Sequence, residues 1–225
     1  MIGWILFGLV ALGSWLVQLN FTKKFEKYSK VRIASNMTGA QVAEKMLRDN
    51  GLYDVQVTST SGTLTDHYNP TNKTVNLSEE VYSGNSIAAA AVAAHECGHA
   101  VQHAHAYAPL QLRSALVPAV SFASRWVQWI LLAGMFLINI FPALLLIGIA
   151  LFAITTLFSF ITLPVEIDAS RRATRWLQEA GITSMHDHPM AVGALRSAAY
   201  TYVSAALGSL ATLVYYIMIF LSGRD

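Results

Sequence analysis

The stretch from Ser86 to His105, SIAAAAVAAHECGHAVQHAH, contains two histidines and a glutamate in the pattern His95-Glu96-x-x-His99. Alanine favours helices more than any other residue and no proline interrupts the stretch, so the sequence predicts one helix here. At 3.6 residues per turn, His95 and His99 lie one turn apart on the same face, where both imidazoles can bind one zinc ion. Glu96 flanks them and can take a proton from a water molecule. The pattern therefore predicts a zinc hydrolase with Zn²⁺ as its cofactor.

The composition indicates a membrane protein. Of the 225 residues, 54% are hydrophobic and only 12% are charged, whereas a soluble domain carries about 25% charged residues. The net charge is +2, and we find no basic tract that would favour nucleic-acid binding. The single cysteine, Cys97, cannot form an intrachain disulfide. We interpret it as a small packing residue of the helix rather than a nucleophile.

Four apolar segments are long enough to cross a bilayer. We expect a retained anchor at residues 1–22, two crossings within 125–163, and a last crossing with a short tail at 197–225. The polar part of the chain is then 23–124, with the H-E-x-x-H helix, together with 164–196, where a charged helix should begin near Pro164. We expect residues 106–124, which contain two prolines, to be a connector.

The basic residues predict the orientation in the membrane. With four crossings, all 15 of them except Arg224 fall on the side that carries the polar part. By the positive-inside tendency, that side is cytoplasmic. We therefore expect a mainly α-helical, multi-pass protein of the cell membrane, with about four transmembrane helices and a small α+β domain in the cytosol.

The polar segment before the H-E-x-x-H helix predicts a short helix and two strands. Residues 38–41, TGAQ, have the form of a capping box that opens a helix. Residues 55–60 alternate like a strand, and a turn near Pro70 leads to a second strand at 73–77. The resulting β-hairpin would either offer an edge strand to an extended substrate or simply cover the helix. His67, beside the turn, is a candidate for orienting substrate.

A third protein ligand must complete the zinc site. His105 has the spacing of the metzincin pattern, but Gln102 stands where that pattern requires glycine. If the helix continues, His105 lies about 15 Å along the axis from His95 and cannot share the metal. The alternative is an acidic residue from a later helix, and Glu166 and Asp168 lie where the third crossing ends. We favour Glu166 as the ligand.

Asp168 would then support the site rather than ligate the metal. Arg171 and Arg172 follow Asp168 at helical spacing and are suitable partners for an ion pair.

Three blocks of the chain resemble a known family. They are LTDHYNPTNKTVNLSEEVY at 64–82, AAVAAHECGHAVQ at 90–102 and LPVEIDASRRA at 163–173. Together they are similar to the YugP-like neutral zinc metallopeptidases of bacterial membranes, and the resemblance extends over nearly the whole chain. It implies a multi-pass membrane protein with zinc peptidase activity and a gluzincin-like domain.

More distantly, the chain resembles the HtpX-type and CAAX prenyl membrane proteases. These relatives take a glutamate of a later helix as the third zinc ligand, and an aspartate follows that glutamate by four residues. Ser170 holds the corresponding place here. The choice between Glu166 and Asp168 as the ligand therefore stays open at this point.

The expected function is that of a membrane-embedded, zinc-dependent metalloendopeptidase. A zinc-activated water would attack the peptide bond, and Glu96 would act as general base. His67, Arg171 and the tyrosines near residue 200 are candidates for stabilising the oxyanion. The expected partners are a protein or peptide substrate, membrane proteins included, and the lipid bilayer; homo-oligomerisation and binding to a membrane partner protein both stay open.

The alternative is a zinc-binding membrane scaffold or regulatory partner with vestigial activity. Glu96 argues against this alternative, because a purely structural zinc needs no general base beside it.

Overall fold

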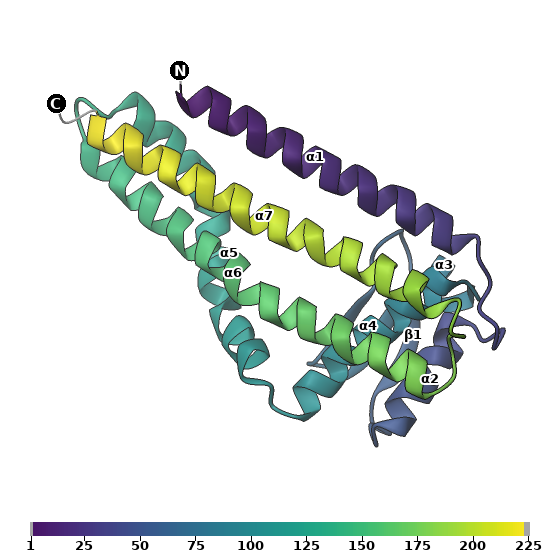
Figure 1. Cartoon of the computed structure of the whole chain (residues 1–225). Coiled ribbons are helices and arrows are strands. Elements are labelled where there is room, and N and C mark those ends of the chain that lie inside the picture. The colour runs from purple at the N-terminus through teal and green to yellow at the C-terminus, as the bar shows by residue number, and fades with distance from the viewer. Residues whose placement is uncertain (1, 223–225) are drawn as a thin grey trace. The chain divides into compact units, whose positions relative to one another are not determined.

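The computed structural model describes residues 2–222, with side chains from residue 8 onward. The described elements follow the order α1 (Ile2–Ser29), α2 (Gly39–Asp49), β1 (Gln56–Thr60), β2 (His67–Asn69), β3 (Thr74–Ser78), α3 (Glu79–Ser83), α4 (Ile87–Ala104), α5 (Ala108–Phe136), α6 (Pro142–Glu179) and α7 (His188–Ser222) (Figure 1). They divide into two compact units. The helical unit comprises residues 2–17, 111–163 and 201–222, and the α/β unit comprises residues 18–110 and 164–200.

Among the described residues, three helices are long and apolar enough to cross a membrane: α5, α6 and α7. Residues 2–22 of the expected anchor at 1–22 lie in α1, whereas Met1 and the side chains of residues 2–7 lie outside the described part. The two crossings expected within 125–163 belong to α5 and α6, and residues 137–141 form the turn between them. A fourth crossing therefore stays a prediction.

Two helices are longer than the sequence predicted. The connector expected at 106–124 is wrong for most of its length, because α5 already begins at Ala108 and continues through Pro118. The helix expected to begin near Pro164 is instead the second half of α6, which continues through that proline. Proline removes one backbone N–H from a helix, but the remaining hydrogen bonds of a long helix keep it intact, and apolar surroundings leave the backbone no competing partner.

Glycines allow α5 and α6 to approach closely in the helical unit. A Cβ atom on Gly134 would lie 2.6 Å from the Cα of Leu145, and one on Gly148 would lie 2.9 Å from Cδ2 of Leu131. Both leucines are buried, with Val127 and Ile149, in a cluster of this unit. Small residues at such crossings are typical of packing between membrane helices.

The α/β unit contains a three-stranded sheet in the order β1-β3-β2. The strands expected at 55–60 and 73–77 form as β1 and β3, but they pair in parallel. The hairpin is instead made by β2 and β3, which pair antiparallel with Tyr68 opposite Val75. Val75 and Leu77 are fully buried in one core with residues of α2 and α4. The sheet is therefore fixed to α4, and β2 is one of its edge strands.

The helix boundaries in this unit follow local capping signals. Thr38 caps α2 and forms the expected capping box with Gln41. Ser86 caps α4 by accepting a hydrogen bond of 3.1 Å from the backbone N–H of Ala89. Helix α4 then runs without interruption to Ala104, as the alanine-rich stretch predicted.

Candidate metal centre

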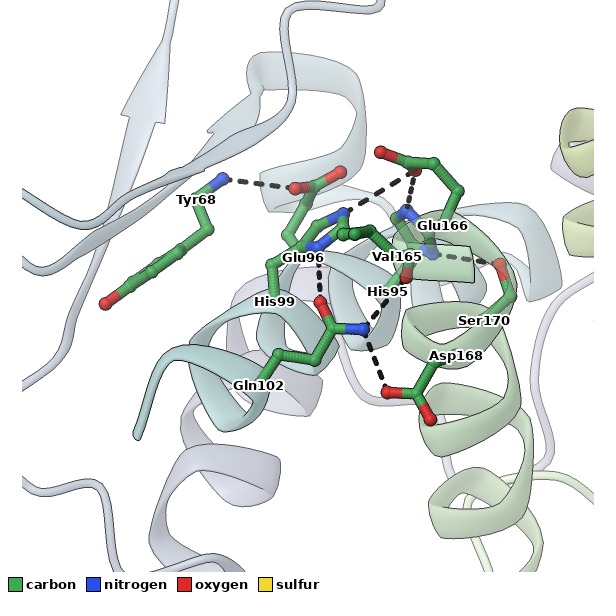
Figure 2. Close-up of polar contacts among 9 residues, drawn as sticks. All are labelled: Tyr68, His95, Glu96, His99, Gln102, Val165, Glu166, Asp168 and Ser170. Carbon is green, nitrogen blue, oxygen red and sulfur yellow. Dashed lines mark hydrogen bonds and ion pairs between the residues drawn. The ribbon is translucent and has the colours of Figure 1, made fainter. Parts of the chain in front are cut away.

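Two histidines of α4 and one glutamate of α6 meet in the α/β unit (Figure 2). His95 and His99 come from consecutive turns of α4, and Glu166 lies in the part of α6 that follows the apolar stretch. Oε2 of Glu166 is 3.2 Å from Nε2 of His95 and 3.6 Å from Nε2 of His99. The Glu166 and His99 side chains are buried, and His95 is only partly exposed.

These distances fit the corners of a zinc site. Ligand atoms at 2.0–2.1 Å from a tetrahedral zinc are separated from one another by about 3.3 Å. The potential ligand atoms of His95, His99 and Glu166 all lie within 4.8 Å of one another. Small shifts of side chains would bring two imidazole nitrogens and one carboxylate oxygen to bonding distance of one ion, with a fourth position left for water.

Gln102 fixes the orientation of His99. The side-chain N–H groups of Gln102 donate to the backbone oxygen of Val165 at 2.8 Å and to Oδ2 of Asp168 at 2.9 Å. These two acceptors place the Gln102 oxygen toward Nδ1 of His99, at 3.1 Å. Nδ1 must therefore carry the proton and donate it, because Oε1 can only accept. Nε2 of His99 is then the nitrogen that faces Glu166, and it can bind a metal once it carries no proton.

Ser170 contacts Nδ1 of His95, just as Gln102 contacts Nδ1 of His99. Its hydroxyl oxygen lies 3.1 Å from Nδ1 of His95, on the far side of the ring from Glu166 (Figure 2). Ser170 is four residues after Glu166, so both side chains lie on the same face of α6. The more distant resemblance implied an aspartate at this position, and a neutral hydroxyl stands here instead.

Asp168 lies outside the group of three. Its Oδ2 atom accepts hydrogen bonds from Nε of Arg172 at 2.6 Å and from Gln102. The ion pair expected with Arg172 is confirmed. Asp168 therefore contacts the histidines only through Gln102, and the structure brings Glu166, and not Asp168, to His95 and His99.

The electrostatics of the cluster favour a cation between its members. Burial by itself would lower the pKa of His99, but the hydrogen bond with Glu166 and the charges of Glu96 and Glu166 raise it above its ordinary value. Burial would raise the pKa of Glu166, yet the hydrogen bonds and charges of the two histidines hold it well below its usual range. Glu166 is thus an anion, and the space between it and the imidazoles attracts positive charge.

Glu96 is buried beside the cluster and is held by the sheet. The backbone N–H of Tyr68, in β2, donates to Oε2 of Glu96 at 3.1 Å (Figure 2). The carboxylate of Glu96, which follows the candidate ligand His95 in α4, is therefore oriented by the backbone of an edge strand rather than by another side chain.

Other predicted residues lie elsewhere. His105 is the C-cap residue of α4, and its Nδ1 donates to the backbone oxygen of Val101 at 2.8 Å. His67 is exposed, and its Nδ1 lies 2.8 Å from the backbone oxygen of Thr65. Arg171 is exposed. Cys97 is fully buried, and burial raises the pKa of its thiol, which agrees with a packing role.

Three supporting residues were not found from the sequence: Gln102, Ser170 and Tyr68. The sequence contained only a weak indication of their roles. Gln102 and Ser170 were noted only as departures from other patterns, although each stands three or four residues from a candidate ligand on the same helix face.

Gly98 allows α4 and α6 to approach closely enough to form the cluster. A Cβ atom at this position would lie 2.7 Å from the backbone oxygen of Ala169 and 3.1 Å from its Cα. Gly98→Ala must therefore separate the two helices, and we expect it to lower the free energy of unfolding by about 1–3 kcal/mol and to weaken metal binding. Thermal unfolding in detergent and zinc titration measure both effects.

Gly13→Ala in α1 is the matched control for this substitution. A Cβ at Gly13 would meet nothing within 4 Å, so the same chemical change should leave zinc affinity as it is. If the two variants had the same free energy of unfolding and the same zinc affinity, the close approach of the helices at Gly98 would not be needed for stability or metal binding.

Comparison with known proteins gives the class of this chain. It belongs to the family described as "Putative neutral zinc metallopeptidase", whose pattern matches residues 3–221. The chain is 47% identical over 218 residues to "Putative membrane protease YugP" of Bacillus subtilis (strain 168), which covers 96% of each protein. The resemblance drawn from the three sequence blocks is thereby confirmed. No solved structure matches the chain. The apolar helices and this relative together indicate a membrane protein.

Proposed function

We propose that the protein is a membrane-embedded, zinc-dependent metalloendopeptidase. The observation that carries the proposal is the convergence of His95, His99 and Glu166 on one another, with the Glu96 carboxylate beside them. Family membership supports zinc as the cation and peptide-bond hydrolysis as the reaction. His95, His99 and Glu166 would hold the ion through two nitrogens and one oxygen, which is a ligand set of hydrolytic zinc enzymes.

Zinc bound there would lower the pKa of a water molecule toward ~7 and polarise the scissile carbonyl. The residues of the chain supply the other functions. Glu96 accepts the proton of the attacking water and passes it to the leaving amine. Gln102 and Ser170 hold the two imidazoles by their Nδ1 atoms, so that both Nε2 atoms stay directed at the ion.

Strand β2 supports an endopeptidase rather than another hydrolase. It is an edge strand of the sheet, and it lies against the helix that carries Glu96. The Tyr68 N–H of this edge is already bonded to Glu96, so an extended peptide would add through the other outward-facing main-chain groups, and such hydrogen bonds recognise the backbone of many sequences. We therefore propose that substrates bind in extended form along β2, with the scissile bond next to Glu96. His67 begins this strand and keeps its candidate role in orienting substrate.

Metal removal tests the proposed function. The purified protein in detergent is incubated with a mixture of unstructured peptides, and the products are identified by mass spectrometry. We expect internal peptide bonds to be cleaved, a strong zinc chelator to abolish cleavage, and added Zn²⁺ to restore it, because the ion supplies the attacking water with its acidity. Stoichiometric zinc without cleavage of any peptide would instead support the zinc-binding scaffold.

The membrane topology is a separate proposal. Ser14 of α1 accepts a hydrogen bond of 2.9 Å from Ser204 of α7, and a Cβ on Gly208 of α7 would lie 3.4 Å from Val10 of α1. Thus α1 packs along a helix that is apolar enough to span a membrane. These contacts support α1 as a fourth crossing, which would leave the α/β unit on one side of the membrane. That unit, residues 18–110 and 164–200, carries 12 of the 15 basic residues, all except Arg113, Arg125 and Arg224. We propose that this side is the cytoplasm.

Cysteine labelling in intact cells checks the orientation, in a Cys97→Ala background. Thr71 is exposed in the turn between β2 and β3, so Thr71→Cys should react with an impermeant thiol reagent only after the cells are permeabilised. Ile140, between α5 and α6, is 81% exposed, and Ile140→Cys should react in intact cells. The reverse pattern would place the active site outside the cell.

A further inference from the structure

Tyr68 contacts α4 at two points, one through its backbone and one through its side chain. Its N–H donates to Oε2 of Glu96 at 3.1 Å, and its phenol oxygen lies 3.0 Å from Nδ1 of His103. The two rings pack with their centroids 5.8 Å apart. Glu96 and His103 are seven residues apart, which is two turns, so they lie on the same face of α4. Tyr68 therefore spans two turns of the helix that carries the candidate general base.

From this double contact we infer that Tyr68 is a positioning residue for Glu96. Its N–H holds one carboxylate oxygen of Glu96, and its phenol, anchored on His103, holds strand β2 at the distance from α4 that this hydrogen bond requires. The inference rests on the proposed function, because it assigns to Glu96 the role of general base. It concerns residues outside the three candidate metal ligands.

The Tyr68 N–H is available because β2 is an edge strand. In an antiparallel pair, alternate residues direct their backbone groups toward the partner strand or away from it. Tyr68 directs its N–H away from β3 and toward Glu96. The hydrogen bond to Glu96 therefore does not replace any hydrogen bond between β2 and β3. One carboxylate oxygen of Glu96 is held by β2, and the other is left to meet the attacking water.

The anchor on His103 is suited to this role at neutral pH. Burial, with a smaller contribution from the charge of Asp54, raises the pKa of the Tyr68 phenol. The phenol therefore stays protonated, and it donates to Nδ1 of His103 in the tautomer that carries its proton on Nε2. His103 is exposed on α4 and lies outside the group of candidate ligands. A histidine that is not a ligand thus connects the substrate-binding strand to the catalytic helix.

Kinetics of four variants test the anchor and the N–H separately. Tyr68→Phe and His103→Leu each lose the side-chain contact, and we expect each to lower kcat by about 3–10-fold with KM unchanged, since a displacement of under 1 Å costs less than 10²-fold. The double variant should be no worse than either single one, because the pair acts as a unit. Tyr68→Pro also lacks the N–H, and an edge strand tolerates proline where the N–H faces away from the sheet. It should lose about 10–100-fold in kcat while it keeps zinc.

Hydrogen exchange gives a readout that does not depend on cleavage. The peptide that covers residues 65–70 reports on the Tyr68 amide. In Glu96→Ala this amide should exchange at least ~10-fold faster, because its acceptor is gone. In Glu96→Gln the side-chain oxygen still accepts, so the amide should stay protected. Tyr53 is 81% exposed, and Tyr53→Phe should change neither exchange nor kinetics.

The inference and the proposed function can fail separately. Unchanged exchange of the Tyr68 amide in Glu96→Ala would overturn the inference even if the enzyme cleaves peptides. Additive losses of kcat in the Tyr68→Phe, His103→Leu double variant would also overturn it. Protection that depends on Glu96, in a protein that cleaves no peptide, would support the contact and reject only the proposed function.

Discussion

Replacing Glu166 with alanine is expected to remove zinc and peptidase activity together. Two imidazoles alone hold the ion weakly, because a catalytic zinc site uses three protein ligands. Glu166 is also the anion of the cluster, and its oxygen lies 3.2 Å from Nε2 of His95 and 3.6 Å from Nε2 of His99. The zinc-to-protein ratio of the purified variant should fall from about one toward zero. Metal analysis and the peptide cleavage assay measure the two losses.

Three further variants show that this loss is specific. Asp168→Ala and Gln102→Leu disturb the hydrogen bonds that support His99, so they should weaken zinc binding by about 10–100-fold without abolishing it. His105→Ala should keep stoichiometric zinc, because that ring contacts the backbone of Val101 and not the cluster. Full zinc in Glu166→Ala, together with loss in His105→Ala, would contradict the assignment and support the metzincin-like one.

Replacing Glu96 with glutamine should abolish most activity while the zinc stays bound. The amide has nearly the shape of the carboxylate and can still accept the hydrogen bond from Tyr68, but it cannot take a proton from water. General bases contribute about 10²–10⁴-fold to rate, and we expect a loss of kcat in this range. Steady-state cleavage by wild-type and variant protein, both loaded with zinc, gives the comparison.

The control for this experiment is the metal content of the variant. Glu96 is not among the three residues that converge, so Glu96→Gln should retain the zinc stoichiometry of the wild type. Equal cleavage by wild-type and Glu96→Gln protein would exclude Glu96 as the base. The same pair of proteins also addresses the substrate, since the inactive variant should retain bound peptides that the active enzyme releases as products.

Local features of the structure could be predicted from the sequence. The capping box at Thr38 and the uninterrupted helix from Ile87 to Ala104 depend on residues within a few positions of one another. The separation of His105 from the cluster follows from that helix alone. The grouping of Glu166 with the histidines was favoured because it is one of few acidic residues after Glu96 and follows an apolar crossing.

Other features depend on distances that no local pattern contains. Pro118 and Pro164 indicated breaks, yet α5 and α6 continue through both, because long apolar helices tolerate one missing hydrogen bond. The parallel pairing of β1 with β3 is set by packing against α2 and α4. The contact of Ser170 with His95, and those of Gln102 with Val165 and Asp168, join α4 to α6 and form only when the two helices are side by side.

Locating the metal is the most direct test of the central claim, that His95, His99 and Glu166 form one zinc site. Anomalous scattering at the zinc absorption edge, from crystals of the zinc-loaded protein, gives the position of the ion. The account predicts one zinc at about 2.0–2.2 Å from Nε2 of both histidines and from a carboxylate oxygen of Glu166. A zinc bound instead by His103 or His105, or by Asp168 in place of Glu166, would contradict it.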